Sequence, residues 1–199
     1  MGKLPHDFYL NPNVTEVAKQ LLGKKLCTFI NQQYTSGIIT ETEAYAGVID
    51  KASHAYNNRL TPRTQTMYQR GGISYVYLCY GIHHLFNVVT SIENIPHAVL
   101  VRAVIPTEGI EAMLKRRNKT KINTNLTCGP GAMSQALGIT TKLNSLDLTG
   151  TTIWIEDVGE NYTEKNILSS ARIGVAYAQD HALWQYRFYI KNHDWVSKK

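Results

Sequence analysis

Two acidic residues and a tyrosine at alternate positions are the most informative feature of the sequence. Glu41, Glu43 and Tyr45 lie in one short segment, and His54 follows after a spacer. In a β-strand, alternate side chains point to the same face, so the two carboxylates and the ring would share one face. Unpaired carboxylates are costly to bury, which makes this face a poor surface for an ordinary core. The pattern indicates a site that cleaves a bond next to a flat, aromatic substrate.

A second cluster of aromatic residues follows farther along the chain. Tyr75 and Tyr77 share one strand face in an apolar run, and Tyr80 precedes Gly81, where the chain is expected to turn. One tyrosine in such a strand is typical of the edge of a core. Three tyrosines that end at a turn favour a rigid ring that stacks on a base or enters a base step, as in proteins that deform DNA.

Basic residues at turns and a positive net charge favour an anionic partner. Arg59, Arg63 and Arg70 stand in threonine-rich and glycine-rich connections, where they suit either phosphate contacts or plain solvation. The glycines around Pro130 precede an expected helix, which is compatible with an anion site and equally with a plain loop-to-helix junction. A net charge of +6 and a pI near 9.2 favour nucleic acid over a membrane as the partner.

Two polar residues interrupt strands that are otherwise apolar. Asn87, if buried, must be hydrogen-bonded either to neighbouring backbone, which is the favoured alternative, or to the edge of a ligand. Arg102 requires a carboxylate or carbonyl partner, and Glu41 or Glu43 is the obvious candidate. His54 by itself is more typical of a structural or surface histidine. No cluster of His, Cys, Asp and Glu has metal-ligand spacing, and no nucleotide-binding glycine loop is present, so neither a metal nor a cofactor is expected.

Length and composition fit one globular domain over residues 1–199. Hydrophobic residues make up 43% of the chain and charged residues 18%, which is ordinary for a soluble protein. No run approaches the roughly 20 apolar residues of a membrane helix, and the first residues lack the apolar stretch of a secretory signal. The three cysteines are widely spaced, which argues against a disulfide framework. These features predict a cytoplasmic protein that is not bound to a membrane.

The elements that position these residues can be predicted from hydrophobic periodicity and from helix and turn signals. Strands are expected at residues 25–30, 37–45, 75–79, 85–91, 98–105, 151–155 and 187–191. Helices are expected at residues 14–23, 107–117, 132–137 and 169–177, with a loop at 118–127. Several strands are separated by short turns, which favours antiparallel pairing. The expected fold class is α+β: a single domain with a curved, mainly antiparallel β-sheet flanked by α-helices.

Taken together, these segments resemble the alkyladenine (3-methyladenine) DNA glycosylase family. The resemblance covers roughly Leu22 to Val196, and the order and spacing of its segments are far more specific than any single motif. The matching segments are Glu41–Tyr45, Ser53–His54, Thr61–Arg63, Tyr75–Tyr77 with Tyr80–Gly81, Asn87, Leu100–Ala103, Cys128–Gly131, Gln135–Ile139, Ala171–Gly174 and Arg187–Tyr189.

The resemblance implies a base-excision repair enzyme that needs no cofactor and acts as a monomer on double-stranded DNA. Such an enzyme flips out an alkylated purine, hydrolyses its N-glycosidic bond with an activated water and leaves an abasic site. In a bacterium it would be associated with the nucleoid through its DNA. Apart from Lys51, no lysine lies where a Schiff base would form, which favours hydrolysis without a lyase step. Activity toward hypoxanthine stays open.

The resemblance also assigns roles to individual residues. Glu43 is expected to activate the attacking water, with Arg102 beside the water and the glutamate. Asn87 is expected to crowd the minor-groove edge of the base, where the amino group of normal guanine would clash. The remaining expected residues are Tyr45, His54 and Tyr77 with Asn87 around the flipped base, Tyr80 as a wedge in the duplex, and Thr61, Arg63, Met67 and Gly131 on the DNA backbone.

Two other classes of function remain compatible with the sequence. The first is a catalytically silent nucleic-acid-binding domain with exposed tyrosines and basic loops. The second is a hydrolase of small nucleosides that uses Glu41 and Glu43 as a carboxylate pair. A DNA enzyme differs from the second class in a strong dependence of binding on salt.

Overall fold

The strands, which differ in length, form one sheet in which all paired strands are antiparallel. A computed structural model describes residues 2–198 of the chain. The strand order is β1-β7-β2-β3-β6-β5-β4, and β9 pairs with β3 and with β8. The strands are β1 (Gly2–Lys3), β2 (Lys25–Ile30), β3 (Gln33–Ala46), β4 (Ser74–Cys79), β5 (His83–Thr90), β6 (His97–Glu108), β7 (Ile153–Asp157), β8 (Ile167–Ser170) and β9 (Arg187–Ile190).

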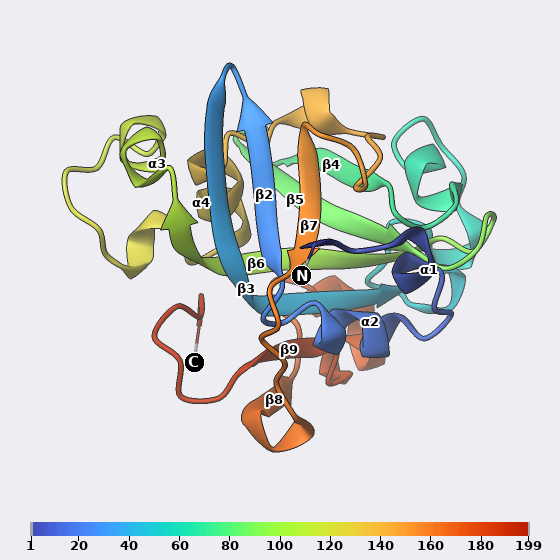
Figure 1. The fold of residues 1–199 in the computed structure, drawn as a ribbon. Helices are drawn as coiled ribbons and strands as arrows, with labels where there is room; N and C mark the ends of the chain where they lie inside the picture. Colours follow the sequence, from blue (N-terminus) through green and yellow to red (C-terminus); the bar gives the residue numbers. More distant parts are fainter. Residues whose placement is uncertain (1, 199) are drawn as a thin grey trace.

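Strand β3 is the central element and it bends in its middle. Its first half pairs with β2 and its second half with β9, while β6 runs along its other edge. The pairing with β6 shifts register on both sides of Glu41. Irregularities of this kind bend a strand and re-aim its side chains. Figure 1 shows the bend, from which the second half of β3 runs sideways between β6 and β9.

Short helices cover the sheet and close its core. Helix α2 (Val14–Gln20) packs on β3 and buries Val17 and Ala18, and the side chain of Asn13 caps its first turn by accepting from the Glu16 N–H. Helix α4 (Pro130–Ala136) packs on β5 and β6 and buries Met133 and Ala136. The α-helices are α1 (His6–Tyr9), α2 (Val14–Gln20), α3 (Ile110–Arg116) and α4 (Pro130–Ala136), and longer loops contain 3-10 turns, of which Ala176–Leu183 is the longest.

The expected fold class is confirmed: the architecture is α+β with a curved antiparallel sheet. The helix expected at residues 169–177 is wrong. Residues 167–170 form β8, because they pair with β9, and Gly174 has a φ of +78° that no α-helix contains. The helix expected at 107–117 begins later, because β6 extends to Glu108 and Gly109, at φ +72°, separates strand from helix. Within residues 2–198, no helix is long and apolar enough to span a membrane.

Candidate active site

The second half of β3 places Glu43 behind the wall of a pocket. The Glu43 carboxylate is 0% exposed and is surrounded by three donors. Its Oε1 accepts from the backbone N–H of Ile173 at 2.8 Å and lies 3.2 Å from Nη1 of Arg102. Its Oε2 accepts from the hydroxyl of Tyr45 at 2.8 Å. These contacts compensate the cost of burying the charge and fix the orientation of both oxygens.

Glu41 lies in a different environment, although it shares the strand with Glu43. Its Oε1 accepts from Nε of Arg102 at 2.8 Å, Nε of Arg187 at 2.7 Å and the hydroxyl of Ser197 at 2.8 Å. Its Oε2 accepts from the N–H of Ser197 at 2.6 Å. Burial would raise the pKa of Glu41, but the two arginines and the Ser197 N–H together lower it below its ordinary value.

Arg102 joins the two carboxylates from the neighbouring strand β6. Its Nε bonds Glu41 and its Nη1 faces Glu43. Arg102 therefore pairs with both glutamates that the sequence offered as its partner. Burial alone would lower the pKa of the Arg102 guanidinium, but the two carboxylates raise it above its ordinary value. The arginine is therefore a fixed positive charge between two buried negative ones.

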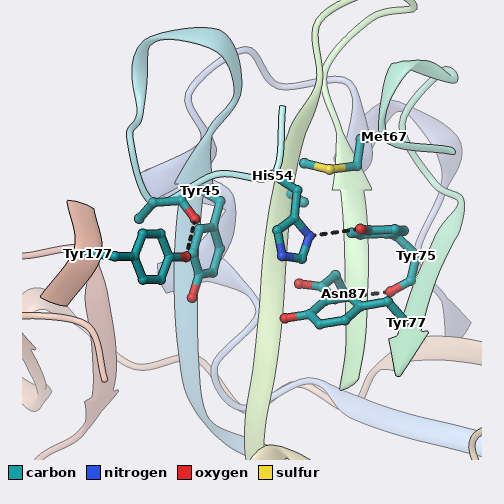
Figure 2. Close-up of a pocket in the computed structure, with 9 residues that line it drawn as sticks. Tyr45, His54, Met67, Tyr75, Tyr77, Asn87 and Tyr177 are labelled. Carbon is teal, nitrogen blue, oxygen red and sulfur yellow. Dashed lines mark hydrogen bonds between the residues drawn. The ribbon is translucent and has the colours of Figure 1, made fainter. Parts of the chain in front are cut away.

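The pocket in front of Tyr45 is lined mainly by aromatic rings. Figure 2 shows Tyr45 and Tyr177 on one side, facing His54 and Tyr77 on the other. The complete lining is Tyr45, Ala52, His54, Met67, Tyr75, Tyr77, Asn87, Ala98 and Tyr177. The structure therefore brings together all four residues expected around a base: Tyr45, His54, Tyr77 and Asn87.

Hydrogen bonds and ring contacts fix one side of this pocket. His54 Nδ1 lies 2.9 Å from the hydroxyl of Tyr75, and its ring meets that of Tyr77 edge to face at 4.7 Å. Asn87 donates through Nδ2 to the Tyr75 carbonyl at 3.0 Å, as the favoured alternative predicted, and it also lines the pocket. The Asn87 side chain can therefore bond the backbone and still face a ligand in the pocket.

The pocket walls carry no charge at neutral pH. Burial, with a smaller effect of Arg63 and Arg59, lowers the pKa of His54 to about 4, so its imidazole is neutral. Burial raises the pKa of Tyr45 and of Tyr77 well above the ordinary value. Neutral, electron-rich rings attract a cation or a cationic base to their faces.

A buried ion pair supports Tyr45 from outside the pocket. The side chains of Asp50 and Arg172 are both 0% exposed, and each carboxylate oxygen accepts from one terminal nitrogen of the guanidinium. Arg172 also donates to the carbonyls of Ala44 and His181, and its guanidinium lies 4.9 Å from the centre of the Tyr45 ring. The pair thereby fixes the segment that connects Tyr45 to His54.

The hairpin between β4 and β5 presents Tyr80 at its tip. The side chain is 88% exposed, and its φ of +50° is followed by +73° at Gly81. A positive φ is uncommon for a residue other than glycine and costs energy. Ile82, next in the turn, is also exposed. The tip therefore holds a rigid ring away from the body of the protein.

A cleft connects the pocket to this hairpin. The cleft is lined by Tyr45, Tyr77, Tyr80 and Arg102 among others, and the first turn of α4, including Gly131, forms its other side. A side chain at Gly131 would come within 2.9 Å of the His83 ring, which explains the glycine. A second, basic cleft beside the pocket contains Lys51 and Arg59.

The four residues expected on the DNA backbone lie in different settings. Thr61 and Arg63 line the basic cleft, and Arg63 lies 4.9 Å from the Tyr77 ring at the pocket mouth. Gly131 lines the cleft that leads to Tyr80. Met67 is only 2% exposed and its side chain faces the pocket, so a contact with DNA would have to come from its main chain.

Sequence reasoning missed several residues of the site. Tyr177 is 66% exposed, lines the pocket and both clefts, and donates to the Ala52 carbonyl at 3.0 Å. A lone tyrosine in an expected helix gave no signal of this role. No pattern in the sequence indicates that the N–H of Ile173 contacts Glu43. Asp50 and Arg172 could have been paired only by knowing which distant segments meet.

Comparison with known proteins points to one family along nearly the whole chain. The family model for methylpurine-DNA glycosylase (MPG) matches residues 7–194. A protein of Chlamydia abortus is 48% identical over 192 residues, covering 95% of this chain and 100% of that relative. Relatives from Alkaliphilus oremlandii and Bacillus cereus are 42% and 44% identical, over 99% and 98% of this chain and 100% and 98% of their own. All three relatives carry the name "Putative 3-methyladenine DNA glycosylase".

Proposed function

The chain belongs to the methylpurine-DNA glycosylase family, and on this premise we propose that it extrudes alkylated purines such as 3-methyladenine from double-stranded DNA and hydrolyses their N-glycosidic bond. Family and relatives identify a DNA-repair glycosylase, which is a hydrolase of N-glycosidic bonds. The proposal adds the way in which the lesion is reached, the group that activates water and the absence of a lyase step. It also takes the protein to act as a monomer.

One observation carries the proposal: Tyr45 is at once a wall of the aromatic pocket and a hydrogen-bond donor to Glu43. A base stacked on the Tyr45 ring would have its glycosidic bond near that carboxylate. Glu43 is itself buried, but all three of its partners, Tyr45, Arg102 and Ile173, line the cleft through which a sugar and a water could approach. In a free enzyme, catalytic contacts are often completed only when substrate binds.

The residues of the pocket suit the chemistry of a damaged purine. Alkylation of a ring nitrogen gives the purine a positive charge, which weakens the bond to the sugar and favours stacking on neutral aromatic rings. Glu43 would take a proton from water and stabilise the positive charge that develops on the sugar. Arg102 would hold Glu43 in place. Asn87 would exclude the amino group of guanine, which hypoxanthine lacks.

Extrusion of the base and hydrolysis without a lyase step also have support. A duplex hides its glycosidic bonds, so the nucleotide must leave the stack, and the exposed ring of Tyr80 is suited to fill the gap. Within residues 2–198, no lysine lines the pocket. Lys51 lies in the neighbouring cleft, and its ammonium donates to the side chain of Gln179 at 2.7 Å. A Schiff base at the sugar is therefore disfavoured.

Incubation with methylated duplex DNA tests the proposal, with released bases identified by chromatography. The wild-type protein should release 3-methyladenine, and a duplex containing hypoxanthine establishes how broad the pocket is. Glu43→Gln should bind the damaged duplex but release no base, because it keeps the shape and loses the proton acceptor. Glu93→Gln, at an exposed glutamate, is the matched control and should keep wild-type release.

Three results would overturn the proposal. Full excision by Glu43→Gln would remove the mechanism. Binding without any release by the wild-type protein would support a silent DNA-binding domain. Activity on free methylated nucleosides with binding that is insensitive to salt would support a nucleoside hydrolase instead.

A further inference from the structure

The segment near the end of the chain, residues 195–198, closes the charge network beneath Glu43. Its Trp195 carbonyl accepts from the hydroxyl of Thr40 at 2.5 Å, and the Trp195 ring packs against the core. The Lys198 carbonyl accepts from Nη2 of Arg187. Between these two anchors, Ser197 is brought next to Glu41 and Arg102.

Ser197 contacts Glu41 and Arg102 with its side chain, and it also contacts Glu41 with its backbone. Its N–H donates to Glu41 Oε2 at 2.6 Å, and its hydroxyl donates to Glu41 Oε1 at 2.8 Å. The same hydroxyl accepts from Nη2 of Arg102 at 3.3 Å. Ser197 lines neither the aromatic pocket nor the cleft, so any influence on the reaction must pass through these partners.

Arg102 transmits this influence because its guanidinium is planar and rigid. Two of its nitrogens are held from one side, Nε by Glu41 and Nη2 by Ser197. The third nitrogen, Nη1, is the one that faces Glu43 at 3.2 Å. Once Nε and Nη2 are fixed, the plane and the direction of Nη1 are fixed as well.

We propose that Ser197 is a positioning residue of the base-release reaction, which orients Arg102 toward Glu43 through the Glu41 network. The inference depends on the proposed function, because it concerns the rate of that reaction. A positioning role for Ser197 differs from a purely structural role in one measurable respect. Ser197 should affect the rate of base release from bound DNA in enzyme that is fully folded, without a matching effect on DNA affinity.

The test measures single-turnover release of 3-methyladenine with enzyme in excess over methylated duplex. Ser197→Ala should release the base about tenfold more slowly, the effect of one charge-assisted hydrogen bond. Affinity for the damaged duplex should stay at the wild-type value. The melting temperature should fall by roughly 3–12 °C, because the buried Glu41 loses one hydrogen bond, and the rate is measured at a temperature where circular dichroism shows the variant to be fully folded. Ser197→Thr, which restores a hydroxyl, should recover most of the rate.

Two further variants test whether the effect of Ser197 on the rate passes through Arg102. Ser170→Ala removes a hydroxyl that accepts from Arg187 at 3.0 Å, and it should keep the wild-type rate because it leaves both hydrogen bonds that hold Arg102, those with Glu41 and Ser197, in place. In an Arg102→Lys background, Ser197→Ala should cause no further loss of rate, because its effect passes through the guanidinium.

Each unfavourable outcome has a defined meaning. A wild-type protein that releases no base overturns the proposed function and this inference together. Wild-type release with an equal rate in Ser197→Ala overturns the inference alone. A loss of rate that comes with partial unfolding at the assay temperature, that threonine does not rescue, or that persists fully in the Arg102→Lys background assigns Ser197 a structural role and overturns the inference too.

Discussion

Replacement of Asp50 by alanine is expected to lower the free energy of unfolding by about 3–5 kcal/mol, because it leaves the buried Arg172 without its counter-charge. The side chains of Asp50 and Arg172 are both 0% exposed and meet in a two-pronged contact. Asp50 also accepts from the N–H groups of Ala46 at 3.2 Å and Ala52 at 2.9 Å. Those donors would lose their acceptor as well, so the upper half of the range is expected.

The loss corresponds to a large change in melting temperature. In a protein of this size, 1 kcal/mol shifts the midpoint by about 2–4 °C, so a loss of about 4–5 kcal/mol should make Asp50→Ala melt roughly 8–20 °C below wild type. Urea denaturation followed by circular dichroism gives the free energy directly. The same substitution at exposed Asp180 is the matched control and should change stability by no more than about 0.5 kcal/mol.

A double variant distinguishes a lost charge partner from a lost packing contact. Asp50→Ala combined with Arg172→Met removes the isolated guanidinium and should recover about half of the loss or more. An Asp50→Ala protein within about 1 kcal/mol of wild type would refute the reasoning. So would a double variant less stable than Asp50→Ala alone, since no uncompensated charge would then explain the effect.

Three further predictions concern the pocket and the DNA surface. Tyr80→Ala should lower affinity for damaged duplex and the single-turnover rate about tenfold, since a base-stacking ring is lost; unchanged values would leave Tyr80 with only a turn-forming role. Because the pKa of His54 falls from 6.5 to about 4 on folding, the unfolded chain binds more protons between these values. The stability that neutral His54 contributes is therefore complete above pH 6.5 and is lost as the pH falls toward 4. In urea denaturation, the free energy of unfolding of His54→Gln should depend less on pH over this window than that of the wild type. Parallel pH profiles of the two proteins would contradict the assignment. Arg63→Gln should reduce the slope of log affinity against log salt by about 1 on damaged and undamaged duplex alike, whereas an unchanged slope would place Arg63 away from phosphate.

Local signals in the sequence predicted most strands but not all of their boundaries. The expected strand 25–30 coincides with β2. The next strand begins at Gln33 rather than at residue 37, because Asn31 and Gln32 both adopt positive φ and form a tight hairpin turn. Such turns are usually recognised by glycine, which is absent at both positions.

The error at residues 169–177 has a tertiary cause. The pattern there is compatible with a short helix, but Ser169 and Ser170 complete the ladder with β9. Arg172 then turns inward to meet Asp50, and the N–H of Ile173 turns toward Glu43. A helix would bind that N–H within its own backbone, so the active-site contact and the helix exclude each other.

The pocket was more predictable than its supports. Strand alternation, which can be counted along a sequence, predicted a shared face for Tyr45 and the two glutamates and another for Tyr75 and Tyr77. The resemblance added the places of Tyr45, His54, Tyr77 and Asn87 around a base, and all four line the pocket. The supports, Arg172 and Tyr177, come from the far end of the chain, and no local pattern indicates that they return to β3. Long-range pairing of this kind depends on the whole sheet.

The distinction between Glu41 and Glu43 is physical, although the sequence presents two similar carboxylates. A carboxylate has about four positions at which it can accept a hydrogen bond. Among the described residues, Glu41 receives four donors, from Arg102, Arg187 and both the N–H and the hydroxyl of Ser197. Glu43 has contacts with three, which leaves one position for a water proton, and its Oε2 carries only the bond from Tyr45, whose ring faces the pocket. Glu41 is thus held by partners that orient Arg102, whereas Glu43 is bonded to a ring of the pocket wall, and this difference supports the proposal that Glu43 is the base.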